Sequence, residues 1–173
     1  MRRHNRSFQR IACGARAIPM LGLALAPFVR IASSDEVETI RDLMRTVIEG
    51  TLEPEHRAPM IGNVNANVDI WLQRPGDCVH LVAVVEDHIV GVILVKDFWN
   101  LCSLFVAHSC QGTGIGKALV EKAIDLCRPR SPKAAILLNA APSAIPFYVR
   151  LGFTARESQQ VLPPGFQAMR LPL

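Results

Sequence analysis

The sequence predicts a mixed α/β domain of the α+β kind, in which helices cover both faces of one sheet. Two apolar runs, VHLVAVVE at residues 79–86 and IVGVILVK at residues 89–96, surround a short Asp87-His88 turn and predict a β-hairpin. A third β run at Leu101–Ala107 leads through a glycine loop into an amphipathic helix, and another apolar run follows at 134–138. The hairpin and this β-α-β unit together predict one mixed sheet.

The chain before the hairpin predicts one strand and one helix. Phe28–Ala32 is a short apolar run typical of a strand, and Ser33 and Glu36 stand at capping-box spacing before a helix. We expect Gly50 to end that helix. Its apolar face is indicated by residues that recur at helical spacing, namely Val37, Ile40, Leu43, Met44, Val47 and Ile48.

Residues 51–76 are mixed and rich in Pro, Gly and Asn. We expect a short helix near Val64–Leu72 and, because small enzymes often place binding residues in such segments, contacts with a substrate. The apolar face of the helix after the glycine loop consists of Ile115, Ala118, Leu119, Ala123 and Leu126. The rest of the chain predicts a helix end at Arg128–Pro132, a strand at Ala134–Leu138, a helix at Pro142–Leu151 followed by Gly152, and strands near Thr154–Val161 and Gly165–Leu171. The predicted order is β-α-α-β-β-β-α-β-α-β-β.

The length of 173 residues and a hydrophobic content of 50% suit one domain with a sizeable core. We expect residues 1–27 to be an N-terminal extension, either disordered or arising from a start assigned too early with Met20 as the true first residue, and residues 28–173 to form the domain. Six arginines in residues 1–30 leave 13 of the 19 basic residues against all 15 acidic ones in the remainder. The domain is therefore not basic, which argues against a nucleic-acid partner. The apolar stretch near the N-terminus is too short to span a membrane.

Five cysteines with irregular spacing contain no CxxC pair and no Cys/His cluster with metal-ligand spacing. We therefore expect no metal site and no disulfide framework, and a cytoplasmic, reducing environment.

The stretch SLFVAHSCQGTGIGKALV at residues 103–120 is typical of a phosphate-binding loop between a strand and a helix. The nucleotide P-loop requires G-x-x-x-x-G-K-[ST], but Lys117 is followed by Ala118 and the position five before Gly116 is Gln111. The dinucleotide fingerprint requires a third glycine where Lys117 stands. The glycines would let the backbone approach an anion, and the free N–H groups and dipole of the helix start would bind it.

A third pattern, Q/R-x-x-G-x-G/A, fits residues 111–116, and LLNAAPSAIPFYVRLGF follows at residues 137–153. These two stretches, in this order, resemble the GNAT superfamily of N-acetyltransferases over roughly residues 28–172. The resemblance implies a GNAT-like fold with a mostly antiparallel central sheet of six to seven strands. It also implies acetyl-CoA as cosubstrate and transfer of an acetyl group to an amine.

The resemblance carries over to particular positions. The strand before the loop would pair its backbone with the pantetheine arm at Leu104, Phe105 and Val106, and an N–H there would hold the developing oxyanion. Asn139, on the strand that splays away in the family, would bind the same arm. The pyrophosphate loop would comprise Gln111, Gly112, Thr113, Gly114, Ile115 and Gly116, with Lys117 at its rim.

Tyr148 is the only tyrosine of the chain and stands where the family has its general acid. A phenol suits protonation of a leaving thiolate, because its pKa near 10 lies above that of a thiol. Many family members carry a glutamate base on the strand before the loop, and residues 100–104 hold no carboxylate. The candidates for a base are Asp97, His108, Glu86 and His80, or the amine arrives deprotonated and needs none.

Three alternatives concern function. The favoured reading is an N-acetyltransferase for a small-molecule or peptide amine by direct transfer in a ternary complex, and a protein N-terminal or lysine acetyltransferase is the second. A non-catalytic acyl-CoA-binding sensor is an alternative of another class. Cys110 as an acyl-carrying nucleophile lacks partners at diagnostic positions. Members of the family often dimerise, so a homodimer stays open.

Overall fold

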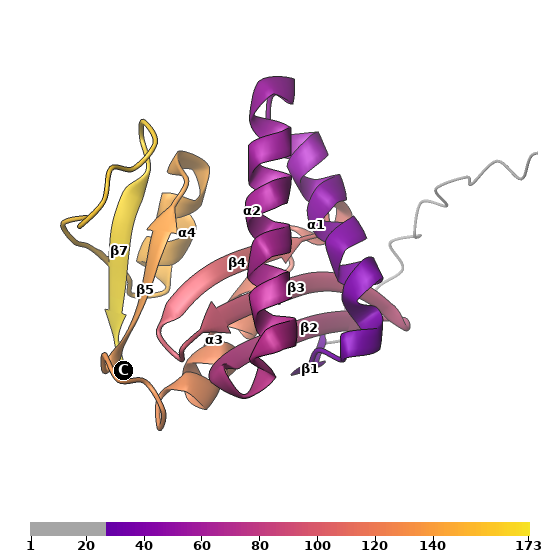
Figure 1. Ribbon diagram of the computed structural model, residues 1–173, viewed down its shortest axis with the longest axis horizontal. Helices are drawn as coiled ribbons and strands as arrows, with labels where there is room; N and C mark the ends of the chain where they lie inside the picture. Colours follow the sequence, from indigo (N-terminus) through magenta and orange to yellow (C-terminus); the bar gives the residue numbers. More distant parts are fainter. Residues whose placement is uncertain (1–26) are drawn as a thin grey trace, which may run out of the picture.

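A seven-stranded sheet with the order β1-β2-β3-β4-β5-β7-β6 runs through the computed structural model, which describes residues 27–173. All neighbouring pairs are antiparallel except β4 and β5, which are parallel. This arrangement confirms the predicted fold class, and Figure 1 shows β5, β7 and α4 standing beside the β1–β4 part of the sheet. Nearly all of the expected N-terminal extension, including Met20, lies outside the described residues. The strands are β1 Phe28–Ile31, β2 Cys78–Val85, β3 His88–Lys96, β4 Asn100–Val106, β5 Ala135–Ala140, β6 Thr154–Ala155 and β7 Gln167–Pro172.

Helices cover both faces of the sheet because the strands bury apolar side chains on both sides. One core cluster joins Val82, Val92 and Leu94 of the sheet to α1 and α2, and the other joins the opposite strand faces to α3 and α4. Figure 1 shows α1 and α2 side by side across one face. The helices are α1 Val37–Thr51, α2 Pro54–Gln73, α3 Ile115–Cys127 and α4 Ile145–Arg150.

The first helix confirms its predicted start and corrects its predicted end. The Ser33 backbone N–H donates to the Glu36 carboxylate at 2.9 Å, as the capping-box spacing predicted. The prediction that Gly50 ends the helix was wrong, since α1 continues to Thr51. A Cβ on Gly50 would lie 2.5 Å from Nε2 of His108, so this glycine instead allows the His108 ring to pack against α1.

The segment after α1 is more regular than the sequence predicted. Instead of a short helix near Val64–Leu72, α2 is a 20-residue helix that begins with Pro54 and contains Pro59. Its buried side chains fall at helical spacing in the second half only, at Val64, Asn67, Val68 and Trp71. The first half therefore gave no periodic signal.

The hairpin turn is shifted by one residue from the prediction. The turn is formed by Glu86 and Asp87, with φ of 48° and 63°, and His88 already belongs to β3. Two left-handed residues in succession match a type I′ turn, whose twist suits a tight hairpin.

The C-terminal part corrects three boundaries. The strand β5 runs to Ala140 and not to Leu138, and α4 is shorter than predicted because a 3₁₀ turn at Pro142–Ala144 precedes it. Gly152, with φ of 89°, follows the helix as predicted. The strand expected over Thr154–Val161 is reduced to the two residues of β6.

Candidate active site

The strands β4 and β5 separate soon after they meet. Their pairing register contains Asn100 opposite Leu137 alone, and the Leu137 N–H donates to the Trp99 carbonyl at 2.7 Å. Beyond that pair β4 continues to Val106 and β5 to Ala140, with no further registered partner between them. We call these two stretches the splayed edges. They expose backbone hydrogen-bonding groups in the middle of a sheet, where such groups are normally paired.

The hydrogen-bonding direction of β4 follows from its partner β3. The Ala107 N–H donates to the Val90 carbonyl at 2.8 Å, and in an antiparallel ladder the direction alternates from residue to residue. The backbone of Phe105, opposite Val92, therefore faces β3, whereas the N–H and C=O groups of Leu104 and Val106 face the splayed edge. Of the three β4 positions expected to bind pantetheine, the strand register thus leaves two with backbone groups available.

The Val106 carbonyl on this edge is already satisfied. It accepts a hydrogen bond from Nε2 of Gln111 at 3.0 Å. Gln111 thus links the glycine loop to the end of β4 by a side-chain hydrogen bond. The phosphate-binding pattern in the sequence did not predict this role. The N–H groups of Leu104 and Val106 and the Leu104 carbonyl remain available along the edge.

The opposite splayed edge is presented by β5. The Leu173 N–H donates to the Ala134 carbonyl at 3.0 Å, so alternation directs the backbone of Leu138 toward β7 and that of Asn139 toward β4. The Asn139 side chain is exposed. The structure therefore brings Asn139 to the edge that faces Leu104 and Val106.

The glycine loop lies at the end of β4 and leads into α3. Gly112 and Gly114 have φ of 78° and 92°, a region that other residues rarely adopt, and a Cβ at either would meet no atom within 4 Å. Thr113 Oγ1 donates to the Cys110 carbonyl at 2.6 Å and closes the loop. The first intrahelical bond runs from the Ala118 N–H to the Gly114 carbonyl, so the preceding N–H groups can bind an anion.

The first turn of α3 is held by packing on both sides. Ile115 is buried, and a Cβ on Gly91 would lie 3.0 Å from its side chain, so the helix approaches β3 closely. Gly116 lies against the Phe147 ring of α4, 3.4 Å from the place of a Cβ. Lys117 is exposed and pairs with Glu121 at 3.8 Å. The loop is therefore rigidly placed at its helix end, and Lys117 stands at its rim.

Tyr148 is buried on the α3 and α4 side of the sheet. Its ring makes edge-to-face contacts with Phe147 and Phe153, at centroid distances of 5.1 and 5.3 Å. Burial raises the pKa of the phenol above its ordinary value, so the hydroxyl keeps its proton at neutral pH. No protein hydrogen bond from this hydroxyl is found within residues 27–173. The group is a protonated donor without a protein acceptor.

The four candidate bases lie in different places. Asp97 is in the turn before β4 and contacts the Arg74 guanidinium at 3.3 Å, while Glu86 is in the β2–β3 turn. The exposed His108 lies against Gly50. His80 is buried under Trp71 at a ring distance of 4.4 Å, and this burial lowers its pKa to about 4. The structure does not gather these residues into one site.

Lys96 and Asn67 form a polar pair that sequence reasoning missed. Lys96 Nζ donates to Asn67 Oδ1 at 2.8 Å, which joins the end of β3 to α2. Asn67 is buried although polar. The signal in the sequence was a lysine at the end of the apolar run IVGVILVK.

Two further observations concern the described part of the chain. Residues 27–173 contain no group of three or more His, Cys, Asp or Glu side chains able to hold a metal ion. They also contain no helix whose length and apolar character would let it cross a membrane.

Solved structures with a similar fold include acetyltransferases in complex with coenzyme A or acetyl-CoA. A family model described as "Acetyltransferase (GNAT) domain" matches residues 66–168. The structure is similar to the PaiA N-acetyltransferase from Thermoplasma acidophilum in complex with coenzyme A, with 17% identity, a TM-score of 0.70, and coverage of 86% of this chain and 100% of that one. It is also similar to a putative acetyltransferase from Salmonella typhimurium with its cofactor acetyl-CoA, with 17% identity, a TM-score of 0.61, and coverage of 85% and 94%. A ribosomal-protein-alanine N-acetyltransferase from Brucella melitensis matches at 20% identity with a TM-score of 0.60 and coverage of 84% and 99%.

Proposed function

This chain belongs to the GNAT family of acetyltransferases, and on that premise we propose that it transfers the acetyl group of acetyl-CoA to a primary amine of a small molecule or peptide, directly and in a ternary complex. The observation that carries the proposal is the pair of splayed edges beside a glycine loop at a helix start. The edges offer backbone groups to the amides of a pantetheine arm, and the loop offers N–H groups to a pyrophosphate. Acetyl-CoA contains both groups.

The residues of the site would divide the work of binding. The loop from Gln111 to Gly116 would hold the pyrophosphate, with Lys117 adding charge at its rim. Leu104 and Val106 on one edge and Asn139 on the other would bind the pantetheine arm. The backbone polar groups of Phe105 face β3, so they would not bind the pantetheine arm.

An N–H on the splayed edge of β4 would also stabilise the transition state. Attack of the amine nitrogen on the thioester carbon moves charge onto the carbonyl oxygen, and a fixed N–H that points there lowers the barrier. The C–N bond then forms as the C–S bond breaks. Tyr148 would donate its proton to the departing sulfur and recover a proton from the water that takes one from the amine. Holding both substrates in one complex also lowers the entropic cost of bringing the amine to the thioester, which further increases the rate.

Two other acceptor classes and one non-enzymatic role compete with this proposal. The Brucella melitensis structure is named for a protein alanine amine, which keeps a protein N-terminus or lysine as the second candidate. A non-catalytic acyl-CoA sensor would bind the same cosubstrate without turnover.

The proposal also includes a homodimer and a cytoplasmic location. The four cysteines of the described chain are free, as a reducing compartment would leave them.

Calorimetric titration of acetyl-CoA into the full chain tests the proposal, with ATP and magnesium as the control ligand. We expect micromolar binding of acetyl-CoA and none of ATP, followed by thiol release when amines are added. Binding without thiol release from any amine would favour the sensor, and absence of binding would contradict both roles.

A further inference from the structure

Different helices cover the two faces of the sheet at the splayed edges. The glycine loop opens α3, and Tyr148 lies in α4, and both helices pack on the same face of the sheet. If the proposed function holds, the CoA thiol and its acid are on that side. A direct transfer then requires the amine to reach the thioester from the opposite face, which α1 and α2 cover.

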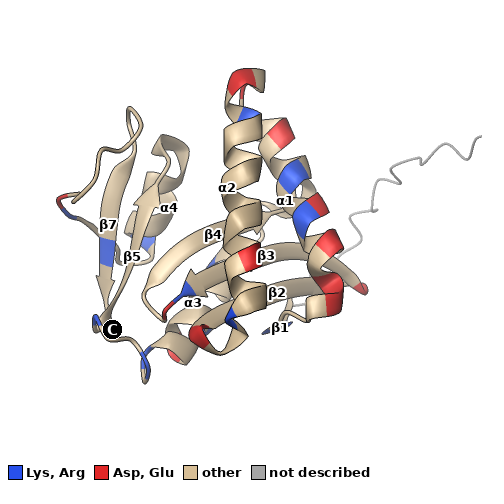
Figure 2. Ribbon diagram, viewed as in Figure 1, with Lys and Arg blue, Asp and Glu red and all other residues tan. Residues whose placement is uncertain are grey.

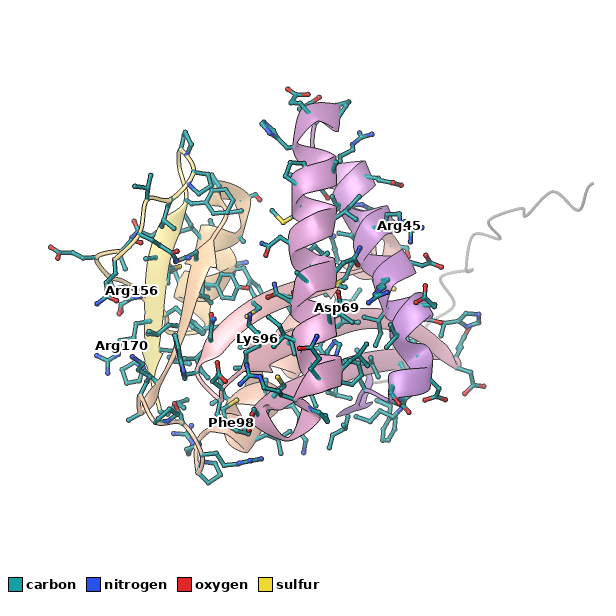
Figure 3. The ribbon with its side chains drawn as sticks, viewed as in Figure 1. Arg45, Asp69, Lys96, Phe98, Arg156 and Arg170 are labelled. Atoms are coloured by element: carbon teal, nitrogen blue, oxygen red, sulfur yellow. The ribbon has the colours of Figure 1, made fainter. Side chains whose placement is uncertain are left out.

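Lys96 lies on this acceptor face at the closed end of the splayed edges. It pairs in register with Asn100, the residue of β4 that contacts β5. Its ammonium donates to Asn67 of α2 at 2.8 Å. Figure 3 shows Lys96 on the face where α2 lies, close to α2 in the view.

The β3–β4 register places Lys96 next to the start of the splayed edge on β4. Burial raises the pKa of the Cys102 thiol to about 11, and the charge of Lys96 opposes that effect. Cys102 follows Asn100 by two residues and lies where the β3–β4 register shifts. The cation is therefore beside the part of β4 that leads into the proposed thioester site.

Lys96 differs from its charged neighbours in having no carboxylate partner. Asp97 contacts Arg74 at 3.3 Å, and Asp69 of α2 contacts Arg41 at 2.6 Å. Within residues 27–173, no carboxylate oxygen lies within 4 Å of Lys96 Nζ. Figure 2 shows that acidic and basic residues gather on α1, while most of α2 is uncharged. The acceptor face thus presents a half-buried ammonium that has an amide partner and no carboxylate partner among the described residues. Ser103, whose buried Oγ has no hydrogen-bond partner there, lies two pairs further along the β3–β4 register.

We propose that Lys96, with Asn67, binds a carboxylate of the acceptor, so that this acetyltransferase acts on amines that also carry a negative charge. A half-buried ammonium that is satisfied only by a neutral amide gains a charge-assisted hydrogen bond when a carboxylate arrives. The same cation disfavours polyamines and other acceptors with several positive charges, because like charges repel. The acceptor is thus an amino acid or a peptide with an acidic residue next to its amine. This inference rests on the proposed function.

Matched pairs of acceptors test the inference in the full chain. Alanine is compared with alaninamide, and an alanyl-glutamate peptide amide with its alanyl-glutamine counterpart, so that each pair differs in one carboxylate. Spermidine represents the polyamines. We expect kcat/KM to favour the carboxylate member of at least one pair by tenfold or more, and the pair that shows the preference distinguishes amino acids from peptides.

The variant Lys96→Gln should abolish this preference by raising the KM for the carboxylate acceptor about tenfold, with the KM for the amide and the affinity for acetyl-CoA unchanged. Lys122→Gln, which removes an exposed lysine of α3, is the matched control and should keep the preference. Lys96→Glu should shift the preference toward cationic acceptors, which loss of packing alone would not do.

A wild-type preference for the amides or for spermidine, or an unchanged preference in Lys96→Gln, would overturn the inference. Titration of N-acetylalanine and N-acetylalaninamide into the CoA-loaded protein measures the same discrimination without turnover. Discrimination in that titration without any acetylation would count against the proposed reaction and support the anion site. Acetylation of all amines at the same rate would support the proposed reaction and count against the anion site.

Discussion

Tyr148 is the residue on which the proposed chemistry depends most. The phenol is protonated at neutral pH, burial raises its pKa further, and within the described residues no protein group accepts a hydrogen bond from its hydroxyl. We expect Tyr148→Phe to lower kcat about 100-fold while the Kd of acetyl-CoA stays within twofold, because the phenol acts on the leaving sulfur in the transition state. Steady-state kinetics and calorimetry on the same samples measure both. Full activity of the variant would remove Tyr148 from the mechanism.

His80 provides a prediction about stability. Burial lowers its pKa in the folded state to about 4, against an ordinary value of 6.5, so the unfolded chain takes up the proton first as the pH falls. The contribution of neutral His80 to the free energy of unfolding is therefore complete above pH 6.5 and is lost as the pH falls from 6.5 to 4. At about 1.4 kcal/mol per pKa unit, the loss is about 3 kcal/mol.

Urea unfolding between pH 7.5 and 4.5 measures this effect. His80→Gln lacks the titrating group, so its free energy of unfolding should fall less steeply with pH than that of the wild type. His56→Gln, which replaces an exposed histidine, is the control and should keep the wild-type slope. The hydrogen bond from Arg30 that lowers the pKa of Glu36 from 4.5 to about 2 adds a loss of stability mainly below pH 4.5, and this loss is common to the wild type and both variants. Equal slopes for wild type and His80→Gln would contradict the assignment.

The glycine loop is an element whose backbone conformation can be tested directly. Gly114 is left-handed at the start of α3, and an alanine there costs about 1–2 kcal/mol in that conformation. A loop that relaxes from this geometry loses its aligned N–H groups, so we expect Gly114→Ala to weaken acetyl-CoA binding about tenfold by calorimetry. Gly76→Ala is the control, because that glycine has open space around it and no left-handed φ. Unchanged affinity in Gly114→Ala would show that the loop is not the pyrophosphate site.

The elements with a strong periodic pattern could be predicted from the sequence, and those without one could not. The hairpin, β4 and α3 were predicted within one residue or so, because apolar alternation or a clear helical face marks them. The long helix α2 was not, because Pro59, Gly62 and repeated Asn residues are poor helix formers and tertiary packing against α1 overrides them. The spacing of its buried residues, from Val64 to Trp71, was the signal available.

The site divides in the same way. The glycine loop and Tyr148 could be located because their local sequence pattern is distinctive. The backbone groups of Phe105 point to β3 and those of Leu104 and Val106 point to the splayed edge, a difference that depends on the β3–β4 register. The pairing of Lys96 with Asn67 joins residues 29 positions apart. Such relations come from tertiary structure, and no local pattern encodes them.

At the scale of the whole molecule, the sheet is two parts that meet at Asn100 and Leu137, and the proposed cosubstrate would bridge them. In the free protein the amides of Leu104 and Val106 face the splayed edge, while the Phe105 amide faces β3. We therefore expect Leu104 and Val106 to exchange their amide hydrogens faster than Phe105 does. Saturating acetyl-CoA should slow exchange at Leu104, Val106 and Asn139 by a larger factor than at Phe105.

Residue-resolved hydrogen exchange by NMR measures this pattern, and ATP at the same concentration is the control. A ligand that binds only the folded state also raises its stability, by about 2.7 kcal/mol at one hundred times the Kd. That global effect slows exchange at sites that open by complete unfolding. Bridging predicts in addition a selective slowing of alternate residues along β4. Uniform slowing of the three consecutive β4 amides would show that acetyl-CoA stabilises the fold without pairing with the splayed edges, and would place its pantetheine arm elsewhere.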